Sequence, residues 1–141
     1  MLIHATAVAI GGRAVLLMGP SGSGKSDLAL RLIDRGAMLI ADDQVRLARA
    51  GDGLTASAPP SIAGRMEVRG VGIVPVSWRD GVPVALLVDL EAPPARLPTP
   101  GTRELLACAV PVIALAAREA SAPIKVELAL RALVCGVEAA R

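Results

Sequence analysis

Aromatic side chains are almost absent from the 141-residue sequence, which contains one Trp and neither Phe nor Tyr. Alanine, valine and leucine must therefore fill the core, and we expect its layers to be thin and closely spaced. Lysine is scarce as well, since Lys25 and Lys125 are the only two lysines in the sequence. Lys and Arg together number 15, and Asp and Glu together number 13. A net charge of +2 without a cluster of basic residues gives no support for nucleic-acid binding.

Long apolar runs are lacking too. Charges or prolines interrupt every candidate before the roughly 18 residues that a membrane span needs. The N-terminus also lacks the basic segment that opens a signal peptide. Cys108 and Cys135 are far apart and have no His near them, which favours reduced thiols in the core. A chain of this length forms one domain, and these absences predict a cytoplasmic protein that does not interact with a membrane.

The apolar pattern predicts alternating strands and one early helix. Residues 2–10 alternate, and residues 14–18 form a continuous apolar run, as in strands buried on both faces. Residues 26–35 place leucine and isoleucine on one helical face, and Gly36 follows where a C-cap belongs. Residues 38–41 predict the next buried strand.

Further strands follow this first unit. Residues 45–48 and 54–58 flank a Gly-containing turn and predict a hairpin. Residues 71–76 and 82–90 predict two more strands, with residues 78–81 as the turn between them.

The last third of the chain is less regular. Residues 91–102 are rich in proline and should be irregular, and residues 110–117 are ambiguous between strand and helix. Ser121 can cap a closing helix with Pro123 near its first turn. The apolar stripe of this helix consists of Val126, Leu130, Leu133 and Val137.

A phosphate-binding loop is the clearest motif. The segment Gly19, Pro20, Ser21, Gly22, Ser23, Gly24, Lys25 and Ser26 fits G-x-x-x-x-G-K-[ST] at every fixed position. Its glycines let successive N–H groups face phosphate oxygens, and the start of the following helix adds positive potential. Lys25 can then reach the β- and γ-phosphates, while the Ser26 hydroxyl can bind magnesium. The alternative is a Gly/Ser turn that matches by chance, but the strand, loop and helix that the motif requires are also predicted.

Two carboxylates, Asp42 and Asp43, end the strand at residues 38–41. A phosphate-binding loop needs a carboxylate near its metal, usually at the end of a buried strand. Adjacent acids on an extended segment point in opposite directions, which indicates separate roles. One would face the magnesium and the other would accept a proton from an incoming hydroxyl. The alternative is a solvated turn without function.

Four segments together resemble the HPr kinase/phosphorylase family. They are His4, the loop at residues 19–26, residues 35–43 with their Arg-Gly and Asp-Asp pairs, and the segment EVRGVGI at residues 67–73. The resemblance implies an α/β fold: a P-loop kinase domain of the HPr kinase and phosphoenolpyruvate carboxykinase type, with a mixed sheet and flanking helices. It also implies ATP and magnesium as cofactors, a serine of an HPr-like phosphocarrier of the sugar phosphotransferase system as the acceptor, and a homo-oligomer, typically a hexamer.

The resemblance also assigns roles to individual residues. Lys25 would hold the transferred phosphates and Asp43 would act as the base, with His4 beside the reacting phosphate. Arg96 resembles the catalytic arginine of the family. The magnesium ligands would be Ser26, Glu67 and Asp42.

Two departures from the family pattern are visible. Full-length members carry an additional N-terminal domain, whereas residues 1–141 are expected to form a single catalytic domain. In the segment linked to the reverse, phosphorylase reaction, the chain reads Arg118, Glu119, Ala120 and Ser121 in place of a Gly/Arg/Asn-containing segment. Glu119 would repel incoming phosphate unless Arg118 or Lys125 compensates, so weak phosphorylase activity is expected. A small-molecule kinase or plain NTPase, and a nucleotide-responsive binding module, stay open as alternatives.

Overall fold

The computed structural model describes residues 1–135, and its regular elements follow the apolar pattern over most of the chain. The helices are α1 (Lys25–Asp34), α2 (Ala122–Cys135) and the short 3-10 helix η1 (Pro60–Ile62). The strands are β1 (Leu2–His4), β2 (Thr6–Ile10), β3 (Arg13–Met18), β4 (Met38–Ala41), β5 (Gln44–Ala50), β6 (Gly53–Ser57), β7 (Arg65–Val68), β8 (Gly72–Pro75), β9 (Val82–Asp89), β10 (Gly101–Leu105) and β11 (Cys108–Ala114).

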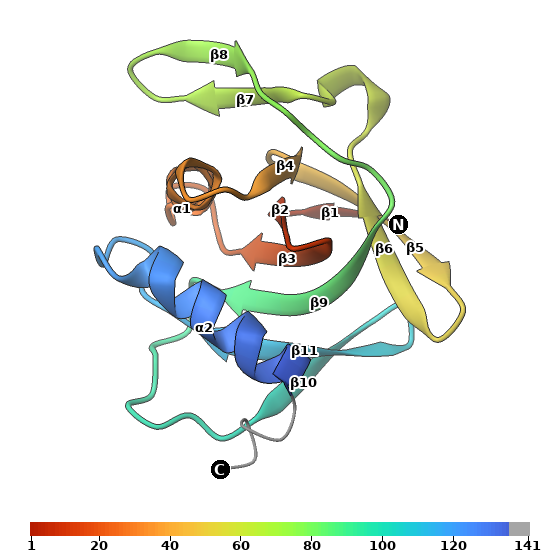
Figure 1. The fold of residues 1–141 in the computed structure, drawn as a ribbon, viewed down its shortest axis with the longest axis vertical. Coiled ribbons are helices and arrows are strands. Elements are labelled where there is room, and N and C mark those ends of the chain that lie inside the picture. Colours follow the sequence, from red (N-terminus) through yellow and green to blue (C-terminus); the bar gives the residue numbers. More distant parts are fainter. Residues whose placement is uncertain (136–141) are drawn as a thin grey trace.

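Most strands form one curved, mixed sheet in the order β1-β5-β6-β9-β3-β2-β4, and β11 and β10 extend it from β9. β9 joins the two halves of this sheet. Its start pairs antiparallel with β6, while its remainder pairs in parallel with β3 and β11. β7 and β8 form a separate hairpin, which projects beyond the sheet at the top of Figure 1.

Side chains of β3 alternate between two apolar layers. Val15 and Leu17 belong to the layer that also contains the buried side chains of both helices. Ala14 and Leu16 belong to the opposite layer, which the inward side chains of β5 and β6 close. Both helices therefore lie against the same side of the sheet, away from β5 and β6 (Figure 1). The expected mixed sheet with flanking helices is confirmed.

The strand expected at residues 2–10 is interrupted at Ala5. β1 pairs with β5, whereas β2 pairs with β3 and β4, so the two pieces belong to different parts of the sheet. The Ala5 N–H donates to the carbonyl of Asp43 at the crossing point (3.1 Å). The prediction of one continuous strand is wrong, because the chain leaves its pairing with β5 at Ala5 and then pairs with β3 and β4.

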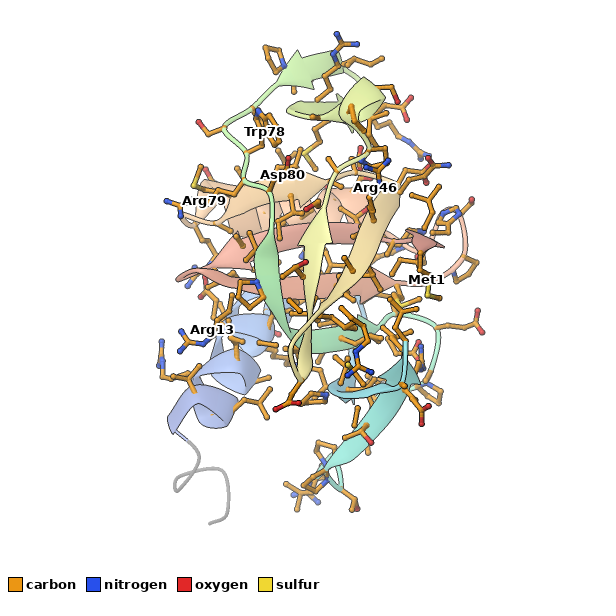
Figure 2. The ribbon with its side chains drawn as sticks, turned by 90° about the vertical axis from the view of Figure 1, so that its right-hand side faces the viewer. Met1, Arg13, Arg46, Trp78, Arg79 and Asp80 are labelled. Atoms are coloured by element: carbon orange, nitrogen blue, oxygen red, sulfur yellow. The ribbon has the colours of Figure 1, made fainter. Side chains whose placement is uncertain are left out.

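Residues 78–81 are not a hairpin turn, because β8 pairs with β7 and not with β9. This segment instead carries the chain from the hairpin back to the sheet (Figure 2). Trp78 forms a parallel bridge with Leu39, and a Cβ built on Gly64 would lie 2.7 Å from the Trp78 ring. The single aromatic residue thus packs directly against glycine backbone, and the Asp80 carboxylate accepts the Ala58 N–H (3.0 Å).

Residues 91–100 are irregular, as expected, but β10 begins within the last two residues of that segment, and β11 covers most of the ambiguous residues 110–117. β10 begins at Gly101 and pairs with β11 around a turn in which Leu106 and Ala107 have φ of 49° and 62°. Left-handed conformations are rare for these residue types, so the turn has no sequence signature. β7 was also not expected.

The closing helix begins close to the expected cap. Val126 and Leu130 are buried, but Leu133 is 40% exposed, so only the first part of the apolar stripe lies in the core. Val137 lies outside the described residues. Cys108 is a buried free thiol, as predicted. Among residues 1–135, no helix is both long and apolar enough to cross a membrane.

Candidate active site

The phosphate-binding loop joins β3 to α1, as its motif requires. Gly22 and Gly24 have φ of 83° and 96°, and Gly24 caps α1 without a side-chain hydrogen bond. The first N–H groups of α1 therefore have no capping side chain and can face an anion. The buried Ser23 hydroxyl in this loop has no hydrogen-bond partner in the described part of the chain. An uncapped helix start fits a phosphate group.

Lys25 is buried, with only 6% of its surface exposed. Its Nζ donates to the carbonyl oxygens of Gly19 (2.7 Å) and Pro20 (3.1 Å). An ammonium group has three N–H donors, so one is left for a phosphate oxygen. Lys25 therefore holds the loop in shape and still contributes charge to the site.

Asp42 joins three segments through its carboxylate. Oδ1 accepts the Ser26 hydroxyl at 2.6 Å and the Thr6 hydroxyl at 3.2 Å, and Oδ2 accepts the backbone N–H of Glu67 at 3.1 Å. The side chain is nearly buried. Burial removes water from the carboxylate, and these three donors compensate for that loss. Because the Ser26 hydroxyl gives its hydrogen to Asp42, its oxygen lone pairs remain free for a cation.

Asp43 has a different environment. Its side chain is 67% exposed, and its Oδ1 lies 3.1 Å from His4 Nε2. The two acids do not lie on an extended segment, since Asp43 has a left-handed φ of 72° in a bend after β4. This conformation turns Asp43 toward solvent while Asp42 faces inward. The expected separation of the two carboxylates is present, although the backbone reason for it is different.

The main cavity has a volume of about 710 Å³ and lies beside the loop. It is lined by Ser21, Gly22, Gly24, Lys25 and Ser26, and also by Asp43, Glu67 and Arg118. Glu67 comes from β7, and the backbone bond to Asp42 holds this strand against the end of β4. The structure thus brings together residues from four segments that are far apart in sequence.

These residues fit magnesium with a nucleoside triphosphate. The hydroxyl of Ser26 and the carboxylates of Asp42 and Glu67 are hard oxygen donors, the type that magnesium binds. Residues 1–135 contain no group of three or more His, Cys, Asp or Glu side chains that could hold a metal ion by themselves. Magnesium commonly uses one or two carboxylates, with phosphates and water in the rest of its shell.

Arg118 was not assigned to the nucleotide site from the sequence, and it lines the main cavity. Its guanidinium donates to the carbonyl of Gly22 in the loop (2.6 Å). The segment before α2 is held there by Arg31 of α1, which donates to the carbonyls of Ala117 and Glu119. Glu119 does not line the cavity, and its carboxylate lies 3.3 Å from Lys125 Nζ. The expected repulsion of phosphate by Glu119 therefore has no support in this geometry, and weak phosphorylase activity stays a prediction.

A second, smaller cavity of about 460 Å³ lies on the His4 side of the loop. Arg103 of β10 lines it and forms an ion pair with Asp89 at the end of β9 (2.9 Å). Arg96 lies in the exposed segment before β10 and lines neither cavity. The structure therefore does not bring Arg96 together with the other assigned residues. Arg103 was missed because the strand that carries it has no sequence signature.

Opposing effects act on the Asp89 carboxyl. Burial works to raise its pKa, but hydrogen bonds from the N–H groups of Glu91 and Ala92, together with Arg103, outweigh burial and lower the pKa below its ordinary value. The charged form is therefore favoured at the end of β9, next to the strand that leads into the phosphate-binding loop.

Comparisons with known proteins agree with this geometry. The family model described as the HPr serine kinase C-terminal domain matches residues 1–84. The HPr kinase/phosphorylase of Caldanaerobacter subterraneus subsp. tengcongensis is 42% identical over 97 residues, which is 63% of this chain and 32% of that protein. The HPr kinase/phosphorylase of Peptoclostridium acidaminophilum is 47% identical over 81 residues, or 57% of this chain and 26% of that protein. The chain thus spans about a third or less of the length of these curated relatives.

The structural similarity extends further along the chain. The structure of the Hpr(Ser) kinase/phosphatase from Coxiella burnetii superposes with a TM-score of 0.84 at 27% identity. The match covers 98% of this chain and 99% of that chain. The fold is therefore that of the HPr kinase domain.

The lowered pKa of Asp89 predicts a pH-dependent contribution to stability. A depressed carboxyl pKa stabilises the fold above the ordinary carboxyl pKa, and this stabilisation is lost as the pH falls through the lowered native value. Asp89→Asn should reduce the free energy of unfolding at neutral pH, and the difference from wild type should shrink in acid. Denaturant unfolding between neutral and acidic pH measures this difference, with Asp52→Asn in an exposed turn as the control. A difference that does not change with pH would contradict the prediction.

Proposed function

The chain belongs to the HPr serine kinase C-terminal domain family, and from this premise we propose that it transfers the γ-phosphoryl group of ATP to a serine hydroxyl of an HPr-like phosphocarrier protein. The observation that carries the proposal is the division between two adjacent carboxylates. Asp42 is nearly buried and bonded to the loop serine, whereas Asp43 is exposed beside the same loop. A phosphoryl-transfer site needs one carboxylate for the metal shell and one for the acceptor hydroxyl.

The residues of this chain would divide the work of transfer as follows. Lys25 and the start of α1 bind and orient the phosphates. Asp43 takes the proton of the acceptor serine hydroxyl while the oxygen of that hydroxyl forms a bond to the γ-phosphorus. The bond from that phosphorus to the β–γ bridging oxygen breaks, and ADP leaves. Ser26, Asp42 and Glu67 would hold magnesium, which when bound neutralises charge on the phosphate oxygens.

A protein acceptor fits the position of Asp43. Its side chain is 67% exposed, so a hydroxyl on a protein loop can reach it without entering a deep pocket. His4 Nε2 contacts this carboxylate and can orient it toward the acceptor. A small-molecule kinase would need further residues to enclose its substrate, and a binding module would not need an accessible base.

We place the reaction in the cytoplasm and expect a homo-oligomer, a hexamer by family resemblance. The phosphocarrier is the protein partner, and neither nucleic acid nor membrane takes part.

Incubation with ATP, magnesium and the phosphocarrier tests the proposal directly. Intact mass should show the addition of one phosphoryl group, and fragmentation should locate it on serine. Lys25→Ala should abolish transfer, because it removes a charge from the phosphates and two hydrogen bonds that hold the loop. Lys125→Ala is a matched control, since Lys125 is the only other lysine and lies on the surface of α2.

Three outcomes would speak against this function. ATP hydrolysis without phosphorylated carrier would favour a plain NTPase, and nucleotide binding without turnover would favour a binding module. Transfer by Lys25→Ala at the wild-type rate would contradict the assignment of the site itself.

Asp43 and Glu67, two of the exposed acids that line the main cavity, should give different phenotypes. Asp43→Asn should lower the transfer rate by about 10²–10⁴-fold with ATP affinity retained, because a general base is lost. Glu67→Gln should raise the magnesium concentration that transfer requires, because a metal ligand is weakened. Titration of the rate against magnesium and ATP separates the two. Exchanged phenotypes would show that these acids are assigned the wrong way round.

A further inference from the structure

We infer that Thr6, a residue to which no role has been assigned, positions the catalytic base. The inference rests on the proposed kinase function and deepens it. Thr6 is the first residue of β2 and is fully buried. Its side chain does not line either cavity, so it acts through its neighbours and does not contact substrate.

The Thr6 hydroxyl contacts both carboxylate residues with opposite polarity. It donates its hydrogen to Asp42 Oδ1 at 3.2 Å and accepts the backbone N–H of Asp43 at 3.2 Å. A hydroxyl has one hydrogen and two lone pairs, so one group can satisfy both bonds. The orientation is fixed, because the carboxylate can only accept and the N–H can only donate.

Asp43 depends on this contact more than Asp42 does. Asp42 keeps two other donors, Ser26 and the Glu67 N–H, when Thr6 is removed. For the N–H of Asp43, Thr6 is the acceptor found among residues 1–135. Asp43 also has a left-handed φ of 72°, a conformation that an aspartate keeps only where its surroundings hold it.

Three consecutive residues hold Asp43 in this conformation. His4 contacts its side chain, the Ala5 N–H donates to its carbonyl (3.1 Å), and Thr6 accepts its N–H. Because the strand is interrupted between β1 and β2, the His4 side chain, the Ala5 N–H and the Thr6 hydroxyl can all contact Asp43. Thr6 supplies the contact that connects the base to the carboxylate of the metal site.

Substitution of the hydroxyl by a methyl group tests the inference. Thr6→Val keeps the shape of the side chain. It should lower kcat for transfer by about 10- to 100-fold, as is typical when a residue that orients a site residue is lost. The KM for ATP should not change. Thr6→Ser restores the hydroxyl and should recover kcat. Thr55→Val, half-buried on β6 and lining neither cavity, controls for the loss of a threonine hydroxyl elsewhere.

Amide hydrogen exchange of Asp43 in the protein without nucleotide supplies a readout independent of activity. The Asp43 N–H should exchange faster in Thr6→Val than in wild type or Thr6→Ser. If wild type transfers no phosphoryl group, the proposed function fails, while exchange still reports on the Thr6 contact. Unchanged exchange at Asp43, wild-type kcat in Thr6→Val, or a folded Thr6→Ser variant with low kcat would each overturn the inference.

Discussion

The hydrogen bonds to the Asp42 carboxylate are the interactions on which the candidate site depends. Through them one side chain at the end of β4 holds the first turn of α1, the start of β2 and the backbone of β7. These segments belong to different parts of the fold, and the hairpin of β7 and β8 stands apart from the main sheet. A buried carboxylate requires donors, so the chain must bring these groups together in order to fold. The requirement that stabilises Asp42 also places Ser26 and Glu67 around one cavity.

The same arrangement explains how adjacent acids come to have different environments. Asp42 faces inward at the strand end, and the left-handed backbone of Asp43 turns the next side chain outward. That conformation is unfavourable for an isolated aspartate, and the contacts from His4, Ala5 and Thr6 offset its cost. The break between β1 and β2 therefore also places three contacts around Asp43.

Much of this site could be predicted from sequence, because its parts are local. The phosphate-binding loop, the strand before it and the helix after it lie within one short segment with a strict motif, and the acids follow at the next strand end. The contacts among these parts were less predictable, because they join residues far apart in the chain. The hydrogen bond from Lys25 to a loop carbonyl and the contact of Thr6 with Asp43 have no signature in composition or spacing. The β10–β11 turn uses Leu106 and Ala107 at positive φ, so the strand that brings Arg103 to the loop was hidden as well.

The hydrogen bond between Ser26 and Asp42 should organise the proposed magnesium–nucleotide site. A double-mutant cycle with Ser26→Ala and Asp42→Asn, measured as the affinity for ADP with magnesium by calorimetry, tests it most directly. If the two side chains act together, the double variant should lose little more affinity than the weaker-binding single variant, with a coupling free energy of about 1 kcal/mol or more. Losses of affinity that simply add in the double variant would contradict the account.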